Sequence, residues 1–330
     1  MDKKLKVGVA LGSGSARGLS HIGVLKALEE LQLQPDIVCG CSSGAIVGAA
    51  YVANNLDRFE TWVLSLQRRD LLRFFEINLS MNGVMDKTKI EQDFNDYVCA
   101  RRQSIEGLSR KFATVATDLE SGQEIWLETG LVMDAVFSSI ALPGLFAPYY
   151  YQNKWLVDGG LLNPVPASLC RALGADVIIA VNLNELAERR GFREKEKPES
   201  ESLALPALPA PTKKSSTQAA LEELLGSRSQ LVSNVSNSIK SYSSFINSLK
   251  NGDPQPPGLI DIFARSINIM QKQIATTRLQ FDAPDVILSP KVNDISLLEF
   301  HRARDAIDEG YACVQRVRPE LEALVEKVYQ

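Results

Sequence analysis

The stretch Ile37-Val-Cys-Gly-Cys-Ser-Ser-Gly-Ala-Ile-Val47 decides how this chain folds. Its first residues, 37–39, predict a short β-rich strand, and Ala45 opens a run of small residues that predicts a helix. Between them, Gly40-Cys-Ser-Ser-Gly44 matches the pattern G-x-S-x-G, in which the serine occupies a strained turn between strand and helix. The two glycines are needed because a Cβ there would clash. Ser42 is therefore the candidate nucleophile, and the N-terminus of the following helix favours a developing alkoxide.

A second strand–loop–helix unit precedes this one. Residues 6–11 predict a buried strand, Gly12-Ser-Gly-Ser-Ala-Arg-Gly18 a loop, and residues 19–31 a helix whose apolar positions recur every three residues. The order strand–helix–strand–helix predicts an α/β fold with a parallel sheet. Consecutive turns of this kind lie at the carboxyl edge of the sheet. We therefore expect the glycine loop, residues 12–18, to lie beside Ser42.

The rest of the chain extends the same sheet. Further strands are expected at 112–117, 124–127, 155–157, 177–181 and 286–288. Further helices are expected at 87–97, 131–139, 167–173, 297–317 and 321–328, with Pro319 separating the last two. We expect a single domain over residues 1–330.

Residues 188–258 interrupt this order and are expected to be an insertion. The segment begins with charged residues, continues as a Pro/Ala/Leu-rich linker, and then carries a helical stripe of apolar residues. Between residues 226 and 250 its few charges are all positive. Such a helix could contact a membrane or cover an acyl site. The alternative is that it packs on its own domain or on a second copy.

The glycine loop allows two interpretations. A dinucleotide-binding turn requires G-x-G-x-x-G spacing and an acidic residue at the end of the second strand, where this chain has Cys39-Gly40. An oxyanion hole requires only backbone N–H groups at a helix N-terminus, which the amides around Gly14 and Ser15 supply. We favour the oxyanion hole. Arg17 could steady the loop, meet a phosphate or be a surface charge.

Few residues can serve as the base for Ser42. The chain has only 2 His, His21 and His301. His21 is expected to pack or cap its helix, and His301 lies in a charged, solvated helix face. Asp158 follows a β-like run and precedes Gly159-Gly160, so it is either a β-turn residue or a carboxylate base close to other backbone.

Composition excludes several classes of protein. With 36 Lys and Arg against 40 Asp and Glu, the chain lacks the basic field of a general nucleic-acid binder. Neither the histidines nor the five scattered cysteines have metal-ligand spacing, and the cysteines favour a reduced, cytoplasmic protein. The apolar run after Lys6 is too short for a signal peptide. The uncharged run 37–56 is glycine-rich and fits a buried strand–turn–helix better than a membrane span.

Taken together, these motifs resemble a patatin-like phospholipase of the bacterial type. The resemblance is carried by the glycine loop with His21-Ile-Gly-Val-Leu25, by Gly40–Gly44, and by Asp158-Gly-Gly160. Supporting stretches are Ala116-Thr-Asp-Leu119, Ala141-Leu-Pro-Gly144 and Asn163-Pro-Val-Pro166. The resemblance covers roughly residues 5–185, with a weaker part at 286–306.

The resemblance implies a three-layer α/β/α fold, a mostly parallel central sheet and a Ser-Asp dyad that needs no metal or cofactor. Ser42 would be the nucleophile and Asp158 the base. The oxyanion hole would be built from Gly12, Ser13, Gly14 and Ser15, with Arg17, Gly40, Gly44, Gly159 and Gly160 in support. The implied activity is release of fatty acid from (lyso)phospholipids or related lipid esters through an acyl-enzyme.

Two other functions stay open from the sequence. One is a regulatory or scaffold protein on the same fold with little activity, because a fold does not fix a function. The other is a Ser-Asp-His hydrolase that uses His301. The expected partner is a lipid or acyl ester, with peripheral contact at the inner face of the membrane through residues 226–250. Nucleic acid is not expected as a partner, and the oligomeric state is open.

Overall fold

The computed structural model describes residues 5–67, 87–184 and 259–329. The chain divides into two units, Met1–Arg189 with Ile260–Gln330, and Arg190–Leu259. The central sheet and the candidate site belong to the first unit. The predicted insertion 188–258, with its segment 226–250, lies outside the described residues and stays a prediction.

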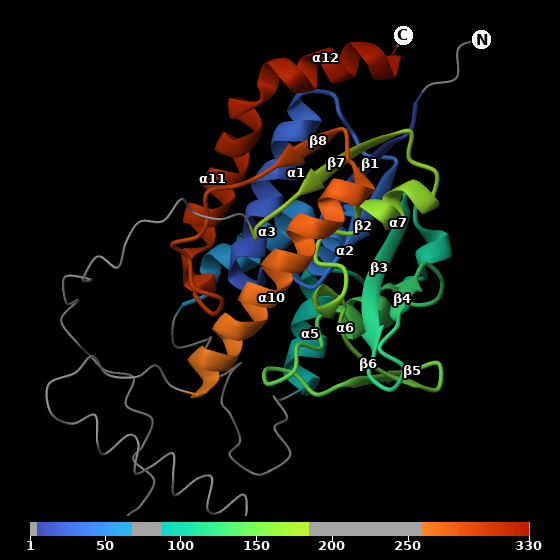
Figure 1. The fold of residues 1–330 in the computed structure, drawn as a ribbon, viewed down its shortest axis with the longest axis vertical. Helices are drawn as coiled ribbons and strands as arrows, with labels where there is room; N and C mark the ends of the chain where they lie inside the picture. Colours follow the sequence, from blue (N-terminus) through green and yellow to red (C-terminus); the bar gives the residue numbers. More distant parts are fainter. Residues whose placement is uncertain (1–4, 68–86, 185–258, 330) are drawn as a thin grey trace, which may run out of the picture. The chain divides into compact units, whose positions relative to one another are not determined.

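A mixed, mostly parallel sheet forms the centre of the described fold (Figure 1). Its strand order is β5-β6-β3-β2-β1-β7-β8, and β4 also pairs with β3. Strands β1, β2, β3, β7 and β8 are parallel to their neighbours in that group. Strands β4 and β6 pair antiparallel with β3, and β5 pairs antiparallel with β6. The strands are β1 Val7–Leu11, β2 Ile37–Gly40, β3 Lys111–Asp118, β4 Glu124–Leu127, β5 Tyr149–Tyr151, β6 Lys154–Asp158, β7 Val177–Val181 and β8 Val286–Leu288.

Helices cover both faces of this sheet. The α-helices are α1 Ser20–Glu30, α2 Ser43–Val52, α3 Leu56–Ser65, α5 Lys87–Tyr97, α6 Val132–Ser139, α7 Ala167–Ala172, α10 Leu259–Asp282, α11 Ala303–Arg316 and α12 Arg318–Tyr329. Short 3₁₀ turns are η1 Ser15–Leu19, η2 Ile105–Gly107, η3 Gly159–Leu161 and η4 Phe300–Arg302.

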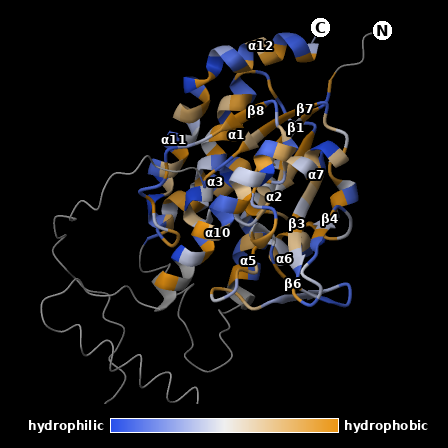
Figure 2. Ribbon diagram, viewed as in Figure 1, coloured by the Kyte–Doolittle hydropathy of each residue, from blue (hydrophilic) through white to orange (hydrophobic). Residues whose placement is uncertain are grey.

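Successive strand residues face two separate hydrophobic cores. In β1, Val9 and Leu11 pack in one core with α1, α2 and α11, while Ala10 packs in the other with α7 and α10. Strands covered on both faces are apolar along their whole length, as Figure 2 shows for β1 and β7. The predicted three-layer α/β/α fold is confirmed.

Within the described ranges, the helices α3 and α10 and the strand β5 were not expected from the sequence. The predicted helix 297–317 was also too long, because its first turn is the 3₁₀ turn η4 and α11 begins only at Ala303. Pro319 does not separate the last two helices. It is the second residue of α12, where a missing N–H costs no helical hydrogen bond.

Candidate functional site

Ser42 occupies a strained turn between β2 and α2. Its backbone has φ 54° and ψ −120°, a conformation that costs a non-glycine residue about 1–3 kcal/mol. The turn closes tightly, because a Cβ at Gly40 would collide with the backbone of Ala45, and one at Gly44 with the carbonyl of Leu11. This geometry agrees with the strand–turn–helix elbow predicted from G-x-S-x-G, and it leaves the Ser42 side chain partly exposed.

The hydroxyl of Ser42 is paired with a carboxylate. Its Oγ donates a hydrogen bond of 2.6 Å to Oδ2 of Asp158, which lies at the end of β6. The other carboxylate oxygen accepts the N–H of Gly160 at 2.7 Å. Asp158 is completely buried, and burial raises its pKa to about 6 against the opposing effect of those two hydrogen bonds. The two predicted residues therefore meet, and the carboxylate is a stronger base than a solvated aspartate.

Two further side chains hold the pair, and the sequence analysis did not find either. The N–H of Ser42 donates to Oγ of Ser139, at the end of α6, over 2.9 Å. The hydroxyl of Thr117, on β3, donates to the backbone carbonyl of Asp158 at 3.1 Å. Both contacts join segments far apart in the chain, so no local pattern marks them.

The glycine loop lies beside Ser42, since β1 and β2 are parallel neighbours. It corrects part of the predicted oxyanion hole. The N–H of Gly12 donates to the carbonyl of Val181 at 3.1 Å, and that of Ser13 to the carbonyl of Pro164 at 2.8 Å. Those two amides are therefore occupied. Among the described residues, no acceptor pairs with the amides of Gly14 and Ser15, which stay the candidate oxyanion donors.

The C-terminal part of the glycine loop, at Ser15 and Ala16, is fixed by its contacts with Leu297. The carbonyl of Leu297 accepts both the hydroxyl of Ser15, at 2.6 Å, and the N–H of Ala16, at 3.0 Å. Ser15 itself has a φ of 53°. These contacts hold the loop in one conformation before any substrate binds, as a preorganised oxyanion site requires.

Arg17 is buried, which excludes the surface charge among the three roles left open for it. Its Nε donates to the carbonyl of Gly14 at 3.3 Å, and a terminal nitrogen donates to Oδ1 of Asn268, on α10, at 2.6 Å. Burial lowers the pKa of Arg17 to about 10. Within the described part of the chain no carboxylate pairs with it. These contacts favour the role of steadying the loop.

The two histidines lie in different surroundings. His21 is fully buried, and its Nε2 is 2.7 Å from the carbonyl of Gly12, which can only accept, so Nε2 carries the proton. Burial lowers the pKa of His21 to about 4, so the ring is neutral at pH 7. His301 is partly exposed in η4. The hydroxyl of Ser42 meets a carboxylate and not an imidazole.

An apolar cavity of about 140 Å³ opens from Ser42. An apolar cavity of about 150 Å³ in another protein binds benzene, so this space accepts a hydrocarbon group. The glycine loop, Ser42 and Gln271 contribute polar groups to its lining. The walls come from α2, α3, α5, α10 and the loop after α6, and include Ile46, Val47, Phe59, Trp62, Phe94, Leu142, Phe146 and Ile267.

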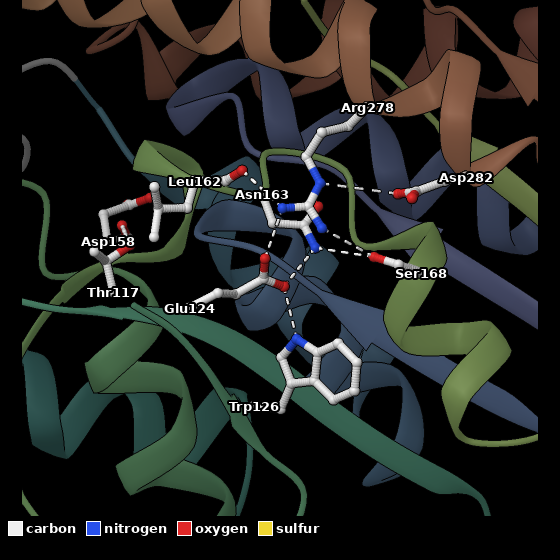
Figure 3. Close-up of polar contacts among 9 residues, drawn as sticks. All are labelled: Thr117, Glu124, Trp126, Asp158, Leu162, Asn163, Ser168, Arg278 and Asp282. Carbon is white, nitrogen blue, oxygen red and sulfur yellow. Dashed lines mark hydrogen bonds and ion pairs between the residues drawn. The ribbon is translucent and has the colours of Figure 1, made fainter. Parts of the chain in front are cut away.

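A polar network lies beside the turn that follows Asp158 (Figure 3). Arg278 of α10 donates to Oε2 of Glu124 at 2.7 Å and to the carbonyl of Leu162 at 3.1 Å. The side-chain amide of Asn163 donates to the other oxygen of Glu124 at 2.7 Å. Helix α10 thus holds the segment that carries Asp158, which the sequence analysis missed because it did not predict this helix.

No group of three or more His, Cys, Asp or Glu side chains in the described part of the chain could hold a metal ion. None of the helices in the described ranges combines the length and hydrophobicity needed to cross a bilayer.

Comparison with known proteins gives related sequences. Residues 9–171 match the family model described as patatin-like phospholipase. An uncharacterised NTE family protein of Mycobacterium bovis is 40% identical over 179 residues, or 54% of this chain and 49% of the relative. Lysophospholipase nte1 of Emericella nidulans is 30% identical over 182 residues, or 54% of this chain and 12% of the relative. The chain therefore spans about half the length of the first relative and a small part of the second. The crystal structure of VipD from Legionella pneumophila matches with a TM-score of 0.39 and 14% identity, covering 96% of this chain and 67% of that chain.

Proposed function

Because residues 9–171 belong to the patatin-like phospholipase family, we propose that this protein is a serine acyl-ester hydrolase with Ser42 as nucleophile and Asp158 as base. The observation that carries the proposal is the 2.6 Å hydrogen bond from Oγ of Ser42, which lines an apolar cavity, to the buried carboxylate of Asp158. No third residue is needed to hold the base, because Gly160 and Thr117 already fix Asp158.

Acylation begins when Asp158 accepts the proton of Ser42 as Oγ attacks the ester carbonyl. The negative charge that develops on the carbonyl oxygen is held by the amides of Gly14 and Ser15, and the N-terminus of α2 adds a favourable dipole. The tetrahedral intermediate then collapses. The C–O bond to the alcohol breaks, and the proton on Asp158 passes to the leaving oxygen, which leaves an acyl-Ser42.

Deacylation repeats these steps with water. Asp158 removes a proton from water as the oxygen attacks the acyl carbonyl, and the same two amides hold the oxyanion. Ser42 leaves as the alcohol after taking the proton back from Asp158. The fatty acid is released and the free enzyme is restored without a metal or cofactor.

The substrate class that fits best is a fatty-acyl ester, with lysophospholipids first. The apolar walls of the cavity suit an alkyl chain, and Emericella nidulans lysophospholipase nte1 is among the relatives. A cytoplasmic location, peripheral membrane contact through residues 226–250, and a single domain with an insertion at 188–258 complete the proposal.

The test measures hydrolysis of a chromogenic acyl ester and of lysophosphatidylcholine by the full-length chain. Ser42→Ala and Asp158→Asn should each lower kcat/KM by about a thousandfold or more. Asp308→Asn, an exposed aspartate on α11, is the matched control and should leave the rate unchanged. A fluorophosphonate probe should label the wild type but not Ser42→Ala. A folded wild type that neither hydrolyses esters nor labels would instead favour a regulatory or scaffold protein.

A further inference from the structure

Helix α10 lies across both loops of the candidate site. It follows the stretch that matches the family model, which ends at residue 171. Its buried face is a stripe at four-residue spacing, Ile267, Gln271, Ala275 and Leu279. Three of these residues are apolar, and the polar one, Gln271, is only 7% exposed. A buried glutamine in an apolar stripe costs stability unless its amide has partners, so its contacts are informative.

The side-chain amide of Gln271 contacts both loops at once. Its Oε1 accepts the hydroxyl of Ser13 at 3.3 Å. Its Nε2 lies directly against Gly160, at the place where a side chain on that residue would begin. A Cβ on Gly160 would also lie 2.9 Å from Oδ1 of Asp158, so the amide nitrogen is in the vicinity of this carboxylate but does not form a hydrogen bond with it. One amide therefore joins the glycine loop to the turn that carries the base, and it also lines the cavity.

The orientation of this amide follows from its surroundings. With Nε2 toward Gly160, an N–H donor faces the region of the Asp158 carboxylate, and Oε1 remains free to accept from Ser13. The reversed amide would turn its carbonyl oxygen toward a carboxylate, which is repulsive. An N–H beside the carboxylate favours its charged form.

We propose that Gln271 is a positioning residue for ester hydrolysis, fixing the glycine loop relative to the Asp158 turn and keeping an N–H dipole near the carboxylate. The inference rests on the proposed function. The spacing matters because the oxyanion donors must lie about 2.7–3.1 Å from the developing charge while Asp158 stays paired with Ser42. A misplacement of about 1 Å can cost a hundredfold in rate.

Two other ionisable side chains, Cys41 and Glu124, bear on a pH test of Asp158. Burial raises the pKa of the Cys41 thiol well above its usual value, and the nearby charges of Asp158 and Glu124 raise it further. Cys41 is therefore neutral near pH 7. Glu124 is paired with Arg278 from α10. At low pH, activity should fall as a carboxyl group becomes protonated, and this part of the pH–rate profile is its acid limb. A change in the pH of the acid limb in a Gln271 variant would therefore report a change in the pKa of Asp158.

The experiment compares Gln271→Met, which keeps the volume and removes both polar contacts, with Gln271→Glu, which keeps an acceptor for Ser13 and adds a charge. Gln273→Met, on the exposed face of the same helix, is the matched control. We expect Gln271→Met to lower kcat about tenfold, with a smaller change in KM. The acid limb of kcat/KM should move to higher pH in Gln271→Met, and by about one unit or more in Gln271→Glu. Gln273→Met should change neither.

A second readout does not need turnover. The carboxyl of Asp158 is titrated by ¹³C NMR in the full-length protein, with Asp158→Asn to assign its signal, and its pKa should rise in both Gln271 variants. Folded Gln271 variants with the wild-type kcat, acid limb and titration would overturn the inference and leave the proposed function standing. A wild type without Ser42-dependent hydrolysis would instead refute the proposed function, while the titration still decides the role of Gln271.

Discussion

The carboxyl group of Asp158 must satisfy two opposing demands. Burial makes it a stronger base, but a proton acceptor must also be ionised at the working pH. Its pKa of about 6 meets both, because at pH 7 roughly nine in ten molecules carry the carboxylate. The hydrogen bonds from Ser42 and Gly160 limit the rise that burial causes.

The pH dependence of activity should therefore follow this one group. We expect kcat/KM for an uncharged acyl ester to rise tenfold per pH unit below about pH 6 and to level off above it. His21 should not add a second limb there, because its folded pKa is about 4. The measurement is the rate between pH 4.5 and 9 under conditions where the fold is intact. An acid limb near pH 4, as for a solvated aspartate, would contradict the role of burial.

At the scale of the element, the strands were the most predictable part of the fold. Each parallel strand is a short apolar run bounded by turn residues, and both candidate loops follow such a run directly, so the sequence was enough to bring Ser42 and the glycine loop together. Asp158 was harder, because β6 is an antiparallel strand that reaches the site by pairing with β3. Only the resemblance singled it out over a β-turn aspartate.

Helix α10 was missed although its sequence carries a signal. Ile267, Ala275 and Leu279 fit a four-residue stripe, but Gln271 interrupts it, and the preceding Pro-rich segment obscures where the helix begins. The oxyanion amides could not be separated by sequence either. Gly12 and Ser13 lose their free N–H groups to the carbonyls of Val181 and Pro164, which lie more than 150 residues away in the chain.

The contact of α10 with the Asp158 segment can be tested through Arg278. Arg278→Met leaves the partly buried Glu124 without its cation, so the free energy of unfolding should fall by about 1–3 kcal/mol. Chemical denaturation of Arg278→Met, Glu124→Gln and the double variant measures the coupling. The double variant should recover part of the loss, since the amide oxygen of the introduced glutamine can still accept from Asn163. Strictly additive losses would show that the ion pair does not hold this segment.

For the whole molecule, the site contributes two opposing effects to the pH dependence of stability. The folded-state pKa of Asp158 is raised from 3.8 to about 6, so between these values the folded state binds more protons and stability falls as pH rises. The folded-state pKa of His21 is lowered from 6.5 to about 4, so over nearly the same range stability rises with pH. In the wild type, the effects of Asp158 and His21 on the pH dependence of the unfolding free energy therefore largely cancel.

Replacing Asp158 by Asn removes the contribution of this carboxyl group to the pH dependence of stability, and it should stabilise the protein at neutral pH. Below pH 3.8 the carboxyl is protonated in both states, and wild type and variant should be similar in stability. Above about pH 6 the wild type carries a buried charge that the variant lacks, so the variant should be more stable by about 3 kcal/mol, from 1.36 kcal/mol per pKa unit. Unfolding free energies from denaturant titrations between pH 4 and 8 test this difference.

Ser42→Ala is the control, because it also abolishes activity but keeps the buried carboxylate. Ser42→Ala should gain no stability, because it removes a hydrogen bond that favours the carboxylate; an equal gain in both variants would show that the buried charge is not its cause.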